Sequence, residues 1–167
     1  MTVAELLQEL EQEAGNTRRT LERVPDDQLA WKPHEKSLSL GQLALHIATL
    51  PGAITEVALR PQFEAGPRPL RPSAASRAEL REAFDQSIAD ATTRLGALDD
   101  AELGVTWKRM NGDQVVMTLP RAAVFRTMLL NHWYHHRGQL TVYLRLLGVP
   151  LPAIYGPSAD ENPFARG

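Results

Sequence analysis

Three stretches of this chain carry a pattern that begins α-helices: a serine or threonine, followed three residues later by Glu or Gln. The two side chains of such a pair can bond the free backbone N–H groups of the first helical turn. The three stretches are Thr2–Glu5, Ser39–Gln42 and Ser76–Glu79. We therefore predict helices over about 3–23, 40–58 and 76–97. The second contains Pro51, which should bend it because proline lacks a backbone donor.

A fourth helix and a hairpin are predicted in the second half of the chain. Pro120 suits the first turn of a helix, and Gly148 followed by Pro150 suits its end. Asn111-Gly112 is the preferred pair for a type I′ turn, so 105–110 and 113–117 should form a β-hairpin.

These elements predict an all-α fold, a four-helix bundle with a small β-hairpin inserted between the third and fourth helices. The proline-rich stretch 61–72 is expected to be an extended crossover between the second and third helices. A length of 167 residues suits one domain with its own core, so we assign 1–167 to a single domain with an irregular tail at 149–167.

Charge and composition narrow the classes of partner. A formal net charge of -2 offers no basic field for a phosphate backbone, so we expect no nucleic-acid partner. No apolar run approaches the length that crosses a bilayer, so we expect no membrane partner. The N-terminus has an acid, Glu5, where a secretory signal would carry positive charge, and we expect a cytoplasmic location. With no cysteine, any metal ion must be held by nitrogen and oxygen ligands.

Two histidines lie on the predicted core face of the fourth helix. At about 100° per residue, His132 and His136 project into an apolar stripe, whereas Tyr134 projects to the opposite side. The stripe consists of Phe125, Leu129, Leu140, Tyr143 and Leu147. A buried imidazole without partners costs about 1–3 kcal/mol. Two imidazoles one helical turn apart, aimed the same way, form half of a metal site.

His46 is the candidate third ligand. It lies beside Leu43 and Leu50 on the second helix, and helices packed ~8–10 Å apart could bring its ring to the other two. Three neutral imidazoles leave a coordination position open, as in catalytic sites. The alternative is three core histidines that are satisfied by hydrogen bonds. His34 is expected to be exposed in a loop, and His135 and Gln139 to lie beside the site without binding metal.

With these residues identified, the chain resembles the DinB/YfiT-like family. The likeness is carried by Trp31–Pro33 with Ser39–Ala48, by His132–Leu140 with Tyr143–Arg145, and by Gly148–Pro150 with Pro152 and Ile154–Glu161. The resemblance implies an up-down-down-up bundle, a homodimer, and a divalent metal ion on His46, His132 and His136.

The resemblance also bears on function. Relatives of this fold include S-transferases that use bacillithiol or mycothiol, so the resemblance implies a metal-dependent enzyme that uses Zn²⁺ or Ni²⁺ and acts on a small molecule. Transfer of a thiol substrate is its more specific form. A hydrolytic version would need a carboxylate base, and Asp160 or Glu161 could serve only if the tail folds back; surface solvation is the expected role of both. The alternative is a non-catalytic, stress-linked metal-binding or interaction module in which the ion fixes the bundle and no cavity lies beside it.

Overall fold

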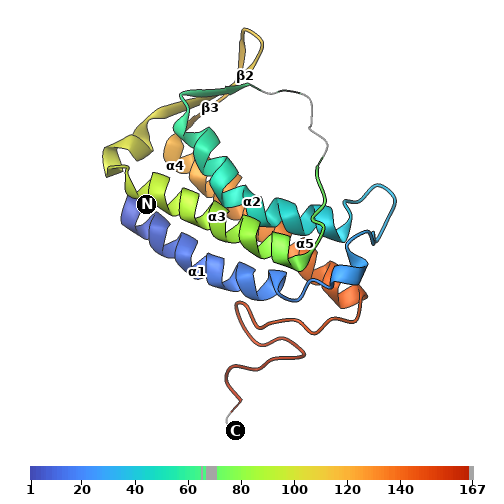
Figure 1. The fold of residues 1–167 in the computed structure, drawn as a ribbon. Coiled ribbons are helices and arrows are strands. Elements are labelled where there is room, and N and C mark those ends of the chain that lie inside the picture. The colour runs from blue at the N-terminus through green and yellow to red at the C-terminus, as the bar shows by residue number, and fades with distance from the viewer. Residues whose placement is uncertain (65, 67–70, 166–167) are drawn as a thin grey trace.

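A computed structural model describes residues 1–64, 66 and 71–165, and four long helical stretches account for most of them. Figure 1 shows the four stretches packed alongside one another, with a small sheet at one end. They are α1 (Val3–Leu21), α2 (Leu40–Leu59), α3 (Arg77–Gly96), and a rod built from α4 (Arg121–Val124), a π-helical segment (Phe125–Asn131) and α5 (His132–Leu146). Single 3₁₀ turns occur at Asp26–Gln28 and Asp100–Gly104. The predicted all-helical framework is confirmed.

The helix starts follow from local side-chain bonds. Thr2 and Ser39 each accept a bond from the backbone N–H three residues on, and the Glu or Gln at that position bonds back to the cap. Ser76 likewise accepts from the Glu79 N–H, while the Glu79 carboxylate accepts from the N–H of Ala75. All three starts lie within a residue of their predicted positions.

The helices pack in a ring around one core. α1 contacts α3, α3 contacts α2, α2 contacts α5, and α5 contacts α1. The expectation that no apolar run approaches the length of a membrane span was wrong for α2, which is long and apolar enough by length and composition alone, with a mean hydropathy of 1.2 over its best window. However, 56% of that window is buried against neighbouring elements, as in the core helix of a folded protein.

The sheet at the end of the bundle has three strands, one more than the sequence predicted. β2 (Thr106–Asn111) and β3 (Gln114–Pro120) form the expected antiparallel hairpin, and Gly112 adopts the positive φ of 56° that its turn requires. β1 (Gln62–Glu64) pairs in parallel with the free edge of β2, in the order β1-β2-β3. The extra strand therefore lies at the start of the predicted crossover, of which residues 65 and 67–70 are outside the described part of the chain.

Long-range bonds to the end of α2 explain why β1 reaches β2. The indole N–H of Trp107 on β2 donates to the Val57 carbonyl, at 3.1 Å. The buried Arg121 guanidinium donates to the carbonyls of Ala58 and Leu59. These bonds hold the end of α2 beside β2, so the chain that leaves α2 meets an unpaired strand edge.

The buried face of α5 differs from the one that the sequence predicted. On α5 the buried residues are Trp133, Arg137, Leu140 and Leu144, whereas Tyr143 and Leu147 are only half-buried. The π-helical segment is the cause: its i→i+5 bonding turns the buried face by about one residue, or roughly 100°, relative to a uniform α-helix. His132 and His136 therefore lie at the edge of the buried face and are half-buried.

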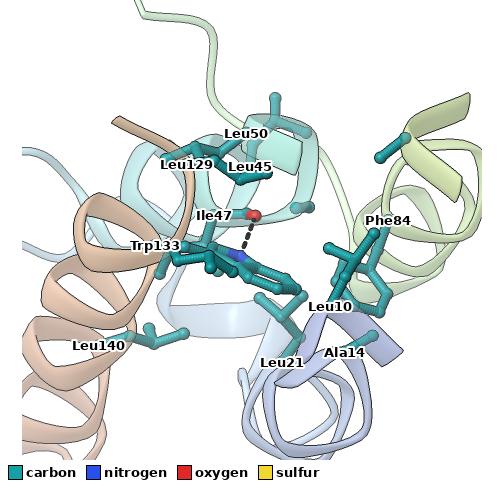
Figure 2. Close-up of a cluster of buried hydrophobic side chains, with 14 of the residues drawn as sticks. Leu10, Ala14, Leu21, Leu45, Ile47, Leu50, Phe84, Leu129, Trp133 and Leu140 are labelled. Carbon is teal, nitrogen blue, oxygen red and sulfur yellow. Dashed lines mark hydrogen bonds between the residues drawn. The ribbon is translucent and has the colours of Figure 1, made fainter. Parts of the chain in front are cut away.

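Pro51 leaves a backbone carbonyl of α2 free to accept a hydrogen bond from α5 within the core. Because proline has no N–H, the carbonyl of Ile47, four residues earlier, lacks its usual helical donor. The buried Trp133 indole N–H donates to that carbonyl at 3.0 Å, as the dashed line in Figure 2 shows. Since Ile47 follows His46 and Trp133 follows His132, this bond joins the two helices next to the histidines.

Candidate metal centre

Three histidine rings from two helices converge at one point. His46 comes from α2, and His132 and His136 come from α5. One ring nitrogen from each lies within 4.8 Å of the other two, and the ring centroids are 4.6–5.3 Å apart. This grouping of nitrogen atoms could hold a metal ion.

Hydrogen bonds at the far side of two rings set which nitrogen faces the centre. Nδ1 of His132 lies 3.3 Å from the Met128 carbonyl, and Nδ1 of His136 lies 2.7 Å from Oε1 of Gln139. With the Gln139 amide in this orientation both acceptors are oxygen atoms, so both Nδ1 atoms donate and each neutral ring presents its Nε2 lone pair. The two Nε2 atoms face each other at 2.8 Å.

The third ring contributes an unsatisfied atom. Nε2 of His46 is buried and has no hydrogen-bond partner within the described part of the chain. A buried polar atom without a partner costs free energy, and such atoms in native structures call for a specific explanation. A bound metal ion would satisfy this nitrogen.

Burial keeps all three rings uncharged. It lowers the pKa of His46 to about 3 and that of His136 to about 4, and the pKa of His132 is also lowered, chiefly by burial. The positive charge of Arg71 lowers each of these pKa values further. At neutral pH the rings are thus in the unprotonated form that binds metal.

A pocket of about 510 Å³ opens beside the histidines. Its walls come from the loop before α2, from α2, from Arg71 and from α5. The lining residues are Lys36, Ser37, Leu38, Leu43, Arg71, His132, His135, His136, Gln139 and Tyr143. A small molecule in this pocket would therefore contact two of the three histidines.

The sequence reasoning did not identify Arg71, which a backbone contact holds at this pocket. The Gln42 side chain caps α2 through Oε1, which accepts from the Ser39 N–H, and its Nε2 donates to the Arg71 carbonyl at 3.0 Å. Gly41 lets this segment approach, because a Cβ there would lie 2.4 Å from Oγ of Ser73. A contact between residues so far apart in the chain leaves no periodic signal in the sequence.

Comparison with known proteins places the chain in a family. A model of the DinB family matches residues 1–163. The chain belongs to the DinB family. The uncharacterized protein YrdA of Bacillus subtilis strain 168 is 30% identical to this DinB protein over 169 residues, which span 96% of this chain and 92% of YrdA.

Solved structures of two other proteins share the fold. A DinB-like protein from Bacillus cereus ATCC 10987 matches with a TM-score of 0.74 at 24% identity, covering 92% of this chain and 98% of that one. The DinB-like protein YjoA of Bacillus subtilis matches with a TM-score of 0.69 at 20% identity, covering 90% and 96%. At these identities the likeness concerns the fold alone.

Three further residues that the sequence analysis considered, His34, His135 and Tyr134, lie outside the group of three histidines in this DinB protein. His34 is exposed, as predicted, and its Nδ1 accepts from the Lys36 N–H. His135 is exposed and lines the pocket, with its ring centroid 5.0 Å from that of His136. Tyr134 was predicted to face away from the core, but the rotated face leaves it half-buried, and its hydroxyl donates to Glu9 of α1 at 2.7 Å.

The two acids of the tail have a structural role that the sequence did not indicate. Asp160 accepts from Arg145 of α5 at 2.5 Å and from the Leu151 N–H at 2.8 Å. Glu161 accepts from Arg19 and Arg23 of α1, at 2.5 and 2.6 Å. Simple surface solvation was therefore the wrong expectation: these acids hold the tail against the bundle.

Proposed function

We propose that this DinB protein binds one divalent metal ion, Zn²⁺ or Ni²⁺, through His46, His132 and His136. The observation that supports it best is the pair of Nε2 atoms facing each other at 2.8 Å, each on a ring whose Nδ1 donates elsewhere. In this tautomer the two lone pairs repel each other at this distance, and a cation bound by both nitrogens removes the repulsion. A proton there would create a half-buried imidazolium beside Arg71, which burial and like charge both oppose. A metal ion meets the same need and also satisfies Nε2 of His46.

We further propose that the site is that of a metal-dependent enzyme acting on a small molecule, with thiol S-transfer as the specific form. A divalent ion held by three imidazoles supplies Lewis-acid activation of a thiol or of water. In this chain the Met128 carbonyl and Gln139 orient the His132 and His136 rings, and the pocket admits the substrate to them. Asp160 and Glu161 are engaged by arginines, so neither is proposed as a base.

The alternative, a non-catalytic module whose ion only fixes the bundle, predicts no cavity beside the histidines. The pocket of about 510 Å³ next to His132 and His136 favours the enzyme. Four further features implied by the family resemblance or by composition are part of this proposal: one domain over 1–167, an up-down-down-up helix order, a homodimer, and a cytoplasmic location without nucleic-acid or membrane partners.

Metal analysis of protein purified without a histidine tag tests the site. We expect about one Zn²⁺ or Ni²⁺ per chain, lost when His46, His132 or His136 is changed to alanine. His34→Ala is the matched control, because it removes an exposed histidine outside the site and should keep the metal. The absence of binding after incubation with either ion, or equal binding by the His34 and His132 variants, would overturn the proposal.

The enzymatic part has its own test. Metal-loaded protein is incubated with an electrophile and bacillithiol, mycothiol or glutathione, and thioether formation is followed. We expect turnover with at least one thiol and none with the His132→Ala, His136→Ala double variant. Turnover that survives this double substitution would contradict a metal-dependent mechanism.

A further inference from the structure

The pocket beside the histidines has a positively charged wall. Arg71 and Lys36 both line it, and among its lining residues in the described chain there is neither Asp nor Glu. A divalent ion on three neutral imidazoles would add two more positive charges. The pocket therefore gathers positive charge that its own lining side chains do not balance.

Arg71 has no acidic partner among the residues that the structure describes, whereas several arginines of the bundle have one. Arg137 pairs with Glu13, Arg126 with Glu9, and Arg145 with Asp160. Nη1 of Arg71 is buried and, within residues 1–64, 66 and 71–165, meets no hydrogen-bond acceptor. A buried guanidinium N–H without an acceptor is costly, and an acceptor on a ligand in the pocket that Arg71 lines would remove this cost.

Backbone contacts hold the segment that carries Arg71 against the start of α2. Its backbone carbonyl is held by Gln42, one helical turn before His46, and the neighbouring Ala74 N–H donates to the Gly41 carbonyl at 3.4 Å. These contacts hold the backbone of Arg71 beside the pocket that its side chain lines, and they leave its Nη1 without an acceptor within the described residues. It lies close enough to the three rings for its charge to act on each of them.

We propose that Arg71 binds an anionic oxygen group, a carboxylate or a phosphate, on the small molecule that contacts the metal, with Lys36 at the exposed rim of the pocket. The planar fork of a guanidinium matches such oxyanions. This inference rests on the proposed function, which assigns the metal ion. It adds the class of substrate, a small anion with a metal-binding group at its other end.

A pair of thiols of similar size, one with a carboxylate and one with a neutral amide at the far end, tests the proposal. Cobalt-loaded protein is titrated with 3-mercaptopropionate and with its neutral amide, 3-mercaptopropionamide, and thiolate binding is followed in the visible spectrum of Co²⁺. We expect the carboxylate to bind about ten- to hundredfold tighter in the unmodified protein, the worth of a charge-assisted bond. The ratio of the two Kd values is compared between variants, so that the different acidities of the two thiols cancel.

Three variants complete the design. Arg71→Ala should abolish the preference while keeping cobalt stoichiometry and helical content, and Arg71→Lys should keep part of it, because it retains charge but loses the fork. Lys32→Ala removes one charge from an exposed position outside the pocket and should leave the ratio unchanged. An unchanged ratio in Arg71→Ala, loss of its cobalt, or no spectral response to either thiol would overturn the inference. Failure of cobalt to bind the unmodified protein would instead refute the metal site, and this inference with it.

Discussion

The bonds on the outer nitrogens of His132 and His136 matter as much as the rings themselves. Each Nδ1 donates to an oxygen of α5 or of the segment before it, and this selects the tautomer that turns Nε2 towards the centre. The acceptor for His132 is a backbone carbonyl and cannot be removed by substitution. The acceptor for His136 is the Gln139 side chain, one turn further along the helix, and can be removed.

Replacing Gln139 with alanine should weaken metal binding about ten- to hundredfold, the usual cost of losing a bond that orients a metal-binding histidine. Gln139 is exposed, so the free energy of unfolding should stay within about 0.5 kcal/mol of the original. Competition with a chelator measures the affinity, and Gln8→Ala, an exposed glutamine on α1, is the control. Equal affinities in the two variants would contradict this role of Gln139.

At the scale of helices, the contact between α2 and α5 places the ligands. Pro51 frees the Ile47 carbonyl, and Trp133 donates to it from α5. Both bonded residues directly follow a histidine of the centre. The π-helical segment contributes by turning α5 so that Trp133 faces inward while His132 and His136 remain beside the pocket.

Trp133→Phe should destabilise the protein by about 1–3 kcal/mol, because it leaves the buried Ile47 carbonyl without a donor. Adding Pro51→Ala should recover part of this loss, since the new N–H at position 51 can donate to Ile47 in the ordinary helical pattern. A double-mutant cycle by urea denaturation measures the coupling, in which the effect of lost indole volume cancels. Strictly additive effects would show that the two residues do not share this carbonyl.

Gly41 is where α2 and the end of the crossover come closest. An added Cβ would lie 3.2 Å from the Leu29 carbonyl and closer still to Ser73. Gly41→Ala should therefore cost about 1–2 kcal/mol through overpacking, partly offset by the better helix propensity of alanine. Gly15→Ala, at an exposed position of α1 with nothing within 4 Å of the added Cβ, should stabilise the protein by about 0.5–1 kcal/mol. Thermal denaturation of the pair should give opposite signs, and equal shifts would contradict the close approach.

On the scale of the whole molecule, a buried ion pair links α1, α5 and the tail. Arg137 pairs with Glu13 at 2.6 Å, and both side chains are about 95% buried. Tyr155 of the tail donates to Glu13 at 2.7 Å and also accepts from Arg137. Together with Asp160 and Glu161, this group makes the irregular tail part of the folded structure.

Glu13→Ala should destabilise the protein by about 3–5 kcal/mol, because it leaves the Arg137 charge buried and unpaired. Glu11→Ala changes an exposed acid on the same helix and should stay within about 0.5 kcal/mol of the original. Equilibrium denaturation in urea gives both values. A difference below about 1 kcal/mol between the two variants would mean that the pair contributes little beyond its own desolvation cost.

The features that could be predicted depend on neighbours within a few residues. Ser39 and Gln42 begin α2 through bonds that span three positions, and Asn111-Gly112 forms its turn from its own backbone preferences. The spacing of His132 and His136 likewise guarantees that their rings lie one turn apart on the same side of a helix. Such interactions are encoded locally, so they can be derived from the order of residues alone.

Contacts between distant segments set the rest. The arrival of His46 at the other two rings, the pairing of β1 with β2, and the placement of Arg71 by Gln42 each join residues far apart in the chain. The π-helical segment adds a further effect. Its change from i→i+4 to i→i+5 bonding rotates every later residue of α5, so the buried face differs from the predicted one. The packing of whole helices chooses among arrangements that local preferences allow equally, and here that packing brought the histidines together.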